Sequence, residues 1–443
     1  MVQDLKLLKQ IYNTFNPFQP LLAGDPVYVD CQEVRGSGDI IRWLGRDILF
    51  SHQNTYQLYA GHRGAGKSTE LLRLKKYLED NHCFVVYFAA DEEDINPQDA
   101  QYTDILLACT RHLLEELKNA DPKPLLNWLQ QRWQNLKDLA LTEISLENMS
   151  VEAQISEFGQ LTANLRATPT LRQKIREQLN LHTTTLIDAL NQFIAEATKQ
   201  LPAGYDKLVV IADNLDRIVP VIQEDGKLNH EHIFLDRSKQ LKALDCHLIY
   251  TVPISLLYSN RATDLLDIYG DAQILPMIMV RTPDEEVYEP GLNKVKEVIA
   301  KRVSQVNPNL SLTTDIFDGQ ETLEKLCLMS GGHVRNLLLM MQSALTLTDS
   351  LPISAKAVQQ AVTKARNIYS NSVDDHQWIE LAQVYRSKLT RNNDLHRSLL
   401  FNRCILEYRH SDDQGNIQLW RDVHPLLKST KEFQAALKEL QHF

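Results

Sequence analysis

The sequence predicts an α/β protein with a parallel sheet at its core, a helical lid after the sheet, and a winged helix at the C terminus. Three observations lead to this prediction. Short, continuous apolar runs alternate with segments of helical period before Pro283, which is typical of strands buried on both faces of a parallel sheet. A glycine-rich loop joins the first of these runs to a helical segment. Beyond Pro283 the period is helical, until two alternating runs near the C terminus.

Length and composition are those of a folded protein with several domains. At 443 residues the chain is too long for one ordinary core, and 43% hydrophobic with 23% charged residues is typical of globular proteins. The formal net charge of -10 disfavours extensive coating of nucleic acid, although it allows one basic face. The six cysteines are scattered without a C-x-x-C pair, so we expect reduced, mostly buried thiols.

No segment of the chain predicts a membrane span or a targeting signal. No apolar run approaches the roughly 20 residues that cross a bilayer. The N-terminal residues Met1–Asp4 do not form a basic region followed by an apolar stretch. We therefore expect a cytoplasmic protein with no membrane contact.

The glycine-rich loop Gly61–Thr69 reads G-H-R-G-A-G-K-S-T and matches the phosphate-binding pattern G-x-x-x-x-G-K-[ST]. It follows the apolar run Tyr56–Ala60, which predicts a strand, and it opens a segment with leucines on one face, which predicts a helix. This order of strand, loop and helix is the context that the pattern requires. The sequence therefore predicts a nucleotide site at this loop.

Each residue type in the loop suits a phosphate ligand. The glycines let backbone N–H groups turn inward around a di- or triphosphate. Lys67 supplies a mobile positive charge for the outer phosphates, and Ser68 supplies a hydroxyl ligand for Mg2+ at the helix start. The expected nucleotide-binding residues of the loop are Gly61, His62, Arg63, Gly64, Ala65, Gly66, Lys67, Ser68 and Thr69.

After the first helix, one predicted strand precedes a long region of mostly helical period. Cys83–Phe88 is a continuous apolar run that predicts a buried strand. Asp91–Asp94 follows it and predicts a solvated turn, although its acids could approach a metal. Alternation around Gly159 predicts a hairpin, and Thr168-Pro169 predicts the cap and first residue of a long helix. Residues 122–168 exceed what a crossover needs, so we interpret them as an insertion.

A second part of the nucleotide site is predicted in Lys207–Arg217, which reads K-L-V-V-I-A-D-N-L-D-R. Its apolar residues predict a buried parallel strand that ends at Asp213, on the sheet edge where ligands bind in open α/β folds. Asp213 is then placed to hold the hydration shell of Mg2+ opposite Ser68. Together with the glycine-rich loop, this strand predicts an ATP or GTP site with Mg2+.

Two further apolar runs complete the predicted sheet. Cys246–Pro253 predicts a strand that presents Thr251 at its end. The Thr251 hydroxyl could bond the attacking water or the terminal phosphate, and packing alone explains such a threonine equally well. Gln273–Val280 predicts another strand, for a sheet of about five strands.

The remaining sequence predicts a helical lid and then a winged helix. One helix ends at Ser330-Gly331-Gly332, and the next carries Arg335 near its start. Two alternating runs joined by a polar turn at 411–416 predict the hairpin of the winged helix. The predicted boundaries are 1–282 for the nucleotide-binding domain, 283–366 for the lid, 367–375 for a linker and 376–443 for the winged helix.

Taken together, these residues resemble the AAA+ and STAND classes of P-loop ATPases. The resemblance rests on the loop at Gly61–Thr69, the strand end at Asp213, Thr251, the Gly331-Gly332 pair and the terminal winged helix, so it spans most of the chain. The D-x-L-D-R sequence that starts at Asp213 is also similar to the KAP type of NTPase. Here, however, the insertion between the two nucleotide motifs is soluble rather than membrane-spanning.

The resemblance implies roles for residues outside the loop. Arg335 looks like the sensor arginine of origin-recognition-type AAA+ lids, which reaches the γ-phosphate. Asp422-Val423-His424 is similar to the M-H-D motif of STAND winged helices, whose histidine contacts the β-phosphate of ADP; packing at a helix start explains His424 equally well. In such ATPases the segment before the loop commonly wraps the adenine, so Tyr28 or Val29 either contacts the base or packs as part of a strand.

Two departures from the family pattern bear on hydrolysis. The glutamate expected after the metal-binding aspartate is Asn214, so water activation could fall to Asp216. The proline expected in the STAND lid motif is also absent. We therefore expect slow hydrolysis, with Arg261 as a candidate finger that would raise the rate only on assembly. The predicted catalytic residues are Lys67, Asp213, Asp216, Thr251 and Arg335, and Ser68 and Asp213 are the predicted metal ligands.

The resemblance implies a switch that binds ATP and hydrolyses it slowly. We expect ADP to hold a closed form, and exchange for ATP to open it for a protein effector, a sensor partner or a homo-oligomer. Prokaryotic members of this class often act in stress or phage-defence signalling, so an antiviral role is one expectation. A nucleotide-binding scaffold without turnover is a further possibility.

The alternative is an initiator- or loader-type ATPase whose winged helix binds DNA. Residues 376–443 hold ten Lys and Arg against eight Asp and Glu, and this net charge of about +2 is modest for a groove-binding domain. His396 and Arg397 are the clear candidate contacts on the presumed reading helix, 394–402. The acid pair Asp412-Asp413 at the tip of the wing would repel phosphate.

Overall fold

The computed structural model describes residues 2–36, 39–117, 120–125, 127–128, 156, 159, 168–412 and 414–441. Most of the predicted insertion at 122–168, with the hairpin expected around Gly159, lies outside these residues.

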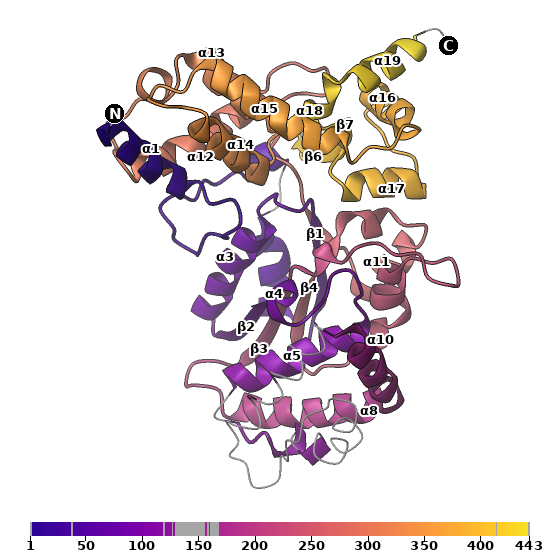
Figure 1. The fold of residues 1–443 in the computed structure, drawn as a ribbon. Coiled ribbons are helices and arrows are strands. Elements are labelled where there is room, and N and C mark those ends of the chain that lie inside the picture. The colour runs from indigo at the N-terminus through magenta and orange to yellow at the C-terminus, as the bar shows by residue number, and fades with distance from the viewer. Residues whose placement is uncertain are drawn as a thin grey trace.

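Five parallel strands form the central sheet, in the order β2-β3-β4-β1-β5 (Figure 1). Because all of them run in one direction, their carboxyl ends meet at a single edge, where the loop after β1 and the end of β3 lie. The strands are β1 (Tyr56–Gly61), β2 (Cys83–Ala89), β3 (Lys207–Asp213), β4 (His247–Pro253) and β5 (Gln273–Leu275).

The last strand is shorter than the sequence analysis predicted. A strand was expected over Gln273–Val280, but β5 ends at Leu275. Pro276 follows, and it has no N–H group with which to continue the ladder. The chain then turns from the sheet toward the winged helix, where the Met277 N–H donates to the Glu407 carbonyl at 3.0 Å.

Helices cover both faces of the sheet, and the alternation of side chains along the strands explains how. Along β3, Val210 and Ala212 belong to the core on one face, whereas Val209 and Ile211 belong to the core on the other. The first face is covered by α5 (Tyr102–Glu116), α8 (Pro169–Lys199), α10 (Ser238–Leu241) and α11 (Ala262–Tyr269). The second is covered by α3 (Lys67–Asp80), α2 (Arg46–Phe50) and the π-helical turn Ile41–Gly45.

The long helix α8 begins where the sequence predicts, with Thr168 as its N-cap and Pro169 in its first turn. It packs with α5 in a layer beneath the sheet (Figure 1). None of the described helices combines the length and apolar character that crossing a membrane would require.

The lid is a bundle of helices above the carboxyl edge of the sheet (Figure 1). The N-terminal helix joins it, because its residues Leu8 and Ile11 and the following Phe15 lie in the lid core. The bundle comprises α1 (Val2–Thr14), α12 (Glu289–Ser304), α13 (Gln320–Met329), α14 (Val334–Thr346) and α15 (Ala355–Ser370).

The C-terminal segment folds as a winged helix that shares one hydrophobic core with the lid. Its two strands pair antiparallel as a hairpin. Its elements are α16 (Gln377–Ser387), α17 (Asp394–Phe401), β6 (Ile405–Ser411), β7 (Ile417–Val423), α18 (Pro425–Lys428) and α19 (Lys431–Glu439). The predicted fold class, a parallel-sheet P-loop NTPase core with a helical lid and a C-terminal winged helix, is confirmed.

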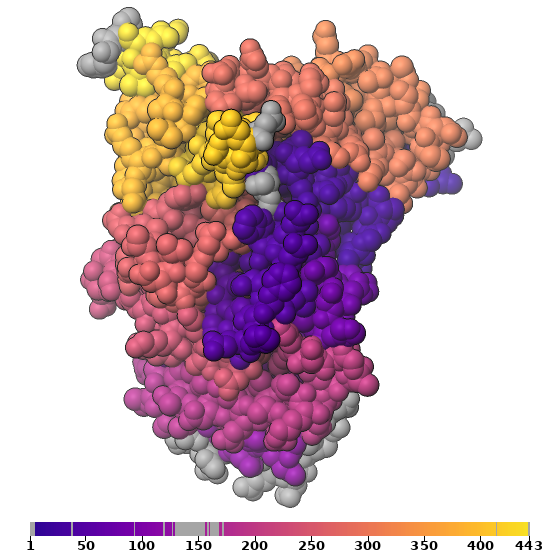
Figure 2. Space-filling view, turned by 180° about the vertical axis from the view of Figure 1, so that it is seen from behind, coloured from indigo at the N-terminus to yellow at the C-terminus, as the bar shows by residue number. Residues whose placement is uncertain are grey.

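The N-terminal segment lies against both upper parts of the molecule. Seen from behind, its indigo surface meets the orange lid and the yellow wing (Figure 2). Gly36 shows how close this contact is, because a Cβ atom there would lie 2.2 Å from the Arg409 carbonyl carbon of β6. Core, lid and winged helix are therefore packed together in the form described.

Candidate nucleotide site

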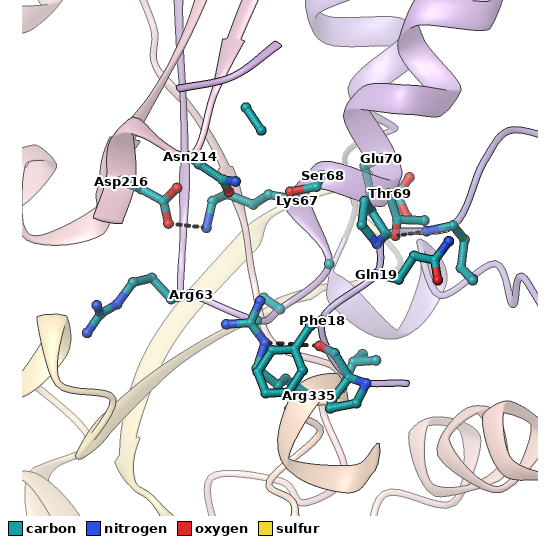
Figure 3. A pocket seen from close by; sticks show the side chains of 18 of the residues that line it. Phe18, Gln19, Arg63, Lys67, Ser68, Thr69, Glu70, Asn214, Asp216 and Arg335 are labelled. Carbon is teal, nitrogen blue, oxygen red and sulfur yellow. Dashed lines mark hydrogen bonds and ion pairs between the residues drawn. The ribbon is translucent and has the colours of Figure 1, made fainter. Parts of the chain in front are cut away.

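A cavity of about 730 Å3 opens at the carboxyl edge of the sheet. The glycine-rich loop forms its floor, and side chains from the core, the N-terminal segment and the lid converge on it (Figure 3). Its lining comes from 17–31, 63–70, 87–89, 214–217 and the start of α14, with the end of α5 on one side.

Two loop glycines show why the loop has its sequence. Gly64 has φ +86°, and a Cβ there would lie 2.7 Å from the His333 ring and 2.8 Å from the Arg335 Cβ. Gly66 has φ +112°, and the nearest neighbour of its missing Cβ is 3.9 Å away, which leaves the backbone open. Other residues rarely adopt such φ angles. The loop can therefore pack against the lid at Gly64 and keep its backbone open to a phosphate at Gly66, so a nucleotide fits this cradle.

Lys67 lies in the cavity wall with its charge already balanced. Its Nζ is 2.9 Å from the Asp216 carboxylate, and both side chains are about 95% buried. The same Nζ donates to the carbonyls of Gly61 at 2.9 Å and His62 at 3.1 Å. A phosphate bound by Lys67 would therefore compete with Asp216 for this ammonium group (Figure 3).

Ser68 and Asp213, the predicted metal ligands, lie together. Asp213 is fully buried at the end of β3 and accepts from the Tyr87 hydroxyl at 2.8 Å, and Ser68 lies close enough to lower its pKa. Burial and the nearby Asp216 raise the pKa of Asp213, and its hydrogen bonds oppose that rise. A hydroxyl and a carboxylate are the oxygen ligands that Mg2+ takes beside phosphates and water, so this pair fits a Mg2+–nucleotide complex.

Asn214 and Thr251 occupy different surroundings beside this pair. Asn214, where a glutamate was expected, lines the cavity and has φ +64°. Thr251 is fully buried between the strands. Its hydroxyl accepts from the Leu215 N–H at 3.0 Å and donates to the Ala212 carbonyl at 3.4 Å. Thr251 thus holds the turn after β3, and it is not part of the cavity lining.

Arg335 lies at the start of α14 and reaches the cavity from the lid. Its backbone N–H donates to the Gly64 carbonyl at 3.1 Å, and its Nε donates to the Pro17 carbonyl at 3.2 Å. The guanidinium lies 5.9 Å from the Phe18 ring centroid. Burial, Arg217 and Arg403 lower its pKa. The lid arginine and the loop are thus in direct contact, and the γ-phosphate contact that the resemblance implies for Arg335 stays a prediction.

His424 is fully buried at the start of α18 and is not part of the cavity lining. Its Nδ1 accepts from the Leu426 N–H at 3.2 Å, and its Nε2 lies 2.8 Å from Nδ2 of Asn336. Its ring lies 4.4 Å from that of Tyr369. Burial lowers its pKa to about 3. His424 therefore links the winged helix to the lid through Asn336, the residue that follows Arg335 in α14.

Two loop residues contact the winged helix. The Nε2 of buried His62 accepts from the Glu407 N–H at 3.0 Å. The Arg63 guanidinium lies 4.3 Å from the ring centroid of Phe401 and donates to its carbonyl at 3.4 Å. Burial, followed by the charge of Lys67, lowers the pKa of His62 to about 3, so it accepts as a neutral ring. The loop expected to hold phosphates is thus bonded to β6 and α17.

The remaining loop residues are held by the segment ahead of the loop. Ala65 is buried, and its carbonyl accepts from Arg35 at 2.8 Å. The Thr69 hydroxyl accepts from the Leu21 N–H at 3.1 Å. These contacts fix the N-terminal segment across the mouth of the cavity.

An apolar wall lies on the Thr69 side of the cavity. Both residues predicted for base contact, Tyr28 and Val29, line it. Phe18 also lines it and is exposed. Nothing in the sequence pattern had singled out this residue. A planar base has room here beside the Phe18 ring.

The acidic segment after β2 is not the solvated turn that was expected. It forms α4 (Ala90–Glu93) and its end, where Asp94 is buried and binds Arg111 and His112, both at 2.9 Å. Asp91 lies 2.5 Å from Arg217. These carboxylates hold α5 and the turn after β3, because each has a cation beside it.

The candidate finger Arg261 is held by two carboxylates. Its Nη1 lies 2.7 Å from Asp236 and its Nε lies 2.8 Å from Asp264. To reach a neighbouring subunit it would have to leave both.

The presumed DNA-reading helix α17 packs against the core. His396 bonds Glu380 at 2.9 Å, and Arg397 donates to the Tyr258 carbonyl at 3.3 Å. Both are buried. Tyr258 ends the 3-10 helix η5 (Ile254–Tyr258), and its ring lies 4.1 Å from the Arg421 guanidinium. In this form neither residue predicted to contact DNA is accessible.

Sequence reasoning missed the buried polar residues that connect the three parts. The His333 Nε2 bonds the Arg63 carbonyl at 2.7 Å, and its Nδ1 accepts from the Asn336 N–H at 3.1 Å. Asn336 then reaches Tyr369 at 2.7 Å and His424 at 2.8 Å. One feature of the sequence could have indicated these contacts: the polar residues His333 and Asn336 stand on both sides of Arg335 at the start of an otherwise apolar helix.

No known family model matches the chain, and no curated protein matches it significantly. Among solved structures, it is similar to Cdc6p from Pyrobaculum aerophilum, at 11% identity and TM-score 0.39, over 97% of this chain and 98% of that one. It is similar to a Walker-type ATPase of Pyrococcus abyssi, at 13% and 0.42, over 96% and 99%. It is also similar to the ORC1 protein of Aeropyrum pernix in complex with DNA, at 10% and 0.37, over 97% and 96%. Likeness at this level supports no inference about what the chain binds.

Proposed function

We propose that this protein is an ATP-binding, slowly hydrolysing switch of the AAA+ and STAND type, in which the bound nucleotide controls docking of the winged helix. The observation that carries this proposal is the direct bond between the phosphate loop and the wing. The Glu407 N–H donates to His62, and Arg63 stacks on Phe401. A change in the loop on nucleotide binding would therefore act on β6 and α17 without an intermediate element.

The residues of the cavity suit ATP or ADP with Mg2+. Lys67 would hold the outer phosphates once it leaves Asp216, and Ser68 with Asp213 would hold the metal. When bound, Mg2+ would neutralise charge on the phosphate oxygens. Hydrolysis would be slow, because Asn214 stands where a water-activating glutamate was expected and Asp216 is occupied by Lys67. Such a protein would change conformation to engage a protein partner or further copies of itself.

The test is a distance measurement between the core and the winged helix. Glu224 and Glu439 are exposed, one in a core loop and one in α19, and the six native cysteines are buried. A Glu224→Cys, Glu439→Cys double variant can therefore carry spin labels at these two sites. The distance distribution is expected to differ between MgADP and a non-hydrolysable MgATP analogue. The same variant with Lys67→Ala is the control and should give one distribution throughout. Identical distributions with both nucleotides would contradict the switch.

A second candidate function is DNA binding by the winged helix. The observation that favours it is the pair of basic side chains, His396 and Arg397, on the helix that a winged helix would place in a groove. Both are buried against the core and α16, so DNA binding would require the wing to leave the core. Tyr258→Ala removes the ring that packs on Arg421 and is expected to release the wing.

A gel shift on duplex DNA separates the two functions. DNA binding predicts that Tyr258→Ala shifts DNA more strongly than the wild type and that adding Arg397→Ala reverses the gain. A DNA affinity that Arg397→Ala leaves unchanged in the Tyr258→Ala background would count against it. Added salt should weaken a true phosphate contact.

A further inference from the structure

Arg302 is a buried cation in the wall of the cavity. It lies on α12, lines the cavity and is 5% exposed. Its Nη1 donates to the Val298 carbonyl at 3.1 Å, one turn earlier on the same helix. Among the described residues, no other acceptor bonds its side chain and no carboxylate lies within ion-pair distance of it. A guanidinium group has five N–H donors, so most of those of Arg302 lack an acceptor within the described chain.

The other buried arginines in the described ranges have stronger partners. Arg35 donates to two carbonyls on other segments, those of Ala65 and Pro276. Four more form ion pairs with carboxylates: Arg172, Arg176, Arg397 and Arg421. Arg302 differs from all of them, because its one acceptor belongs to the preceding turn of its own helix. Its position is therefore not explained by a contact that holds two parts of the fold together.

The charge of Arg302 is unfavourable in the nucleotide-free protein. Burial lowers its pKa to about 10, and Asp25 opposes that shift without reaching ion-pair distance. The group therefore stays charged at neutral pH. A buried charge without a counter-ion lowers the free energy of unfolding. A side chain that costs stability and also lines a cavity points to a ligand that accepts its hydrogen bonds.

Two hydrogen bonds place Arg302 on the side of the cavity where the base is expected. The Tyr28 hydroxyl donates to Glu70 on α3 at 3.2 Å, and the Tyr28 carbonyl accepts from Lys301 on α12 at 2.7 Å. Tyr28 thus connects the helix after the phosphate loop to the residue next to Arg302. The apolar residues that line the cavity here are Val27, Val29, Val298 and Leu338. In such a wall a guanidinium group can fix the orientation of a bound base.

We propose that Arg302 binds the purine base of the nucleotide by donating a hydrogen bond to one of its ring nitrogens. This inference rests on the proposed function, because phosphates held at Lys67 leave the base for this side of the cavity. A guanidinium group only donates, so it cannot bond the amino group of adenine as an acceptor would. Its partner on adenine is therefore one of the accepting ring nitrogens N1, N3 and N7. Arg302 is then a residue of the lid that selects the base, whereas the loop binds phosphates of any nucleotide.

The experiment is calorimetric titration of the nucleotide-free full-length protein with MgADP and with its 1-deaza, 3-deaza and 7-deaza analogues, each of which replaces one accepting ring nitrogen by C–H. One analogue is expected to bind the wild type roughly tenfold more weakly than ADP, from the loss of a hydrogen bond to a charged donor. Arg302→Met removes the charge and keeps an apolar side chain. This variant should bind ADP roughly tenfold more weakly than the wild type and should bind ADP and that analogue equally. Its melting temperature without nucleotide should be unchanged or higher, because a buried charge is gone.

Lys296→Met is the matched control, because Lys296 lies on the same helix, pairs with Glu324 at 2.8 Å and does not line the cavity. It should bind all four nucleotides as the wild type does. If the wild type binds ADP and the three analogues equally, or if Arg302→Met melts lower and keeps wild-type ADP affinity, the proposal for Arg302 is overturned while the nucleotide site stands. If the wild type binds neither ADP nor ATP, the proposed function falls and this proposal falls with it.

Discussion

The two charged regions of the cavity are balanced in different ways. At the core side, Lys67 has a carboxylate and two backbone carbonyls as partners. At the junction with the winged helix, neither Arg63 nor Arg335 has a carboxylate within ion-pair distance among the described residues; Arg63 donates to the Phe401 carbonyl and Arg335 to the Pro17 carbonyl. A phosphate must therefore displace an internal partner at the first region, whereas it would supply a missing one at the second. The core side therefore has its charge balanced without a ligand, whereas the two arginines at the junction have only backbone carbonyls as hydrogen-bond partners among the described residues.

The largest expected effect on binding and stability comes from removing Lys67, the cation whose charge Asp216 balances. Lys67→Ala should abolish nucleotide binding and leave the Asp216 carboxylate buried without its partner. Breaking a buried ion pair in this way costs about 3 to 5 kcal/mol of unfolding free energy. Urea denaturation measures the cost. Lys76→Ala, which breaks an exposed pair with Asp80 on the same helix, is the control and should show no measurable change. If Lys67→Ala and Lys76→Ala were equally stable, the buried pair of Lys67 with Asp216 would stabilise the fold no more than the exposed pair of Lys76 with Asp80, which would contradict the prediction.

Removing the balancing carboxylate separates affinity from hydrolysis. In Asp216→Asn, Lys67 loses its charged partner, so the nucleotide-free protein should be destabilised by roughly 3 kcal/mol. Nucleotide affinity should rise, because the phosphates no longer compete with Asp216. Phosphate release should fall if Asp216 activates water. Titration calorimetry and a phosphate-release assay measure the two quantities on one preparation, and a loss of affinity would show that Asp216 does not restrain Lys67.

Acid should weaken the junction through its buried histidines. The pKa values of His62 and His424 are about 3 in the folded protein, below the value of about 6.5 for an unfolded chain. As the pH falls, the unfolded state takes up protons first, so stability is full above about pH 6.5 and declines toward pH 3. The expected slope is on the order of 1 kcal/mol per pH unit for each histidine.

Denaturation across this pH range measures the slope. Replacing His424 with glutamine should make the slope shallower, whereas the same change at exposed His376 should leave it as in the wild type. A slope that is unchanged in His424→Gln would show that this histidine is not buried in its neutral form.

The smallest expected effect is at Asn336, which bonds Tyr369 and His424. Asn336→Ala should cost about 1 to 2 kcal/mol, because it leaves buried polar partners without a hydrogen bond. Nucleotide affinity should change little, since Asn336 does not line the cavity. Thermal denaturation and calorimetry check these outcomes, and a large loss of affinity would place Asn336 in the binding site instead.

The parts that could be predicted are those with a local pattern. Continuous apolar runs gave the strands, and the run into Asp213 gave its place at the sheet edge. The glycine spacing around Lys67 located the cavity. The end of the last strand at Leu275 also had a signal in the sequence, because Pro276 cannot continue the hydrogen bonding of a sheet. The apolar residues after Pro276 nevertheless led to the prediction of a longer strand.

The parts that could not be predicted depend on residues far apart in the chain. His62 and Glu407 are 345 residues apart, and nothing in either segment indicates the other. The period of α17 shows that one face is apolar, but it does not show that this face packs on η5 with Arg397. Thr251 and His424 have side chains suited to a phosphate, whereas their orientation is set by packing. A residue type can therefore suggest a role that only the fold can assign.

The central claim, that the loop and the buried carboxylate form a nucleotide site, is tested most directly by titrating nucleotide-free wild-type protein with MgATP in a calorimeter. Saturable binding of one nucleotide per chain is expected, weakened when Mg2+ is removed or Asp213 is replaced by alanine, and absent in Lys67→Ala. Failure of the folded wild-type protein to bind either ATP or ADP would contradict it.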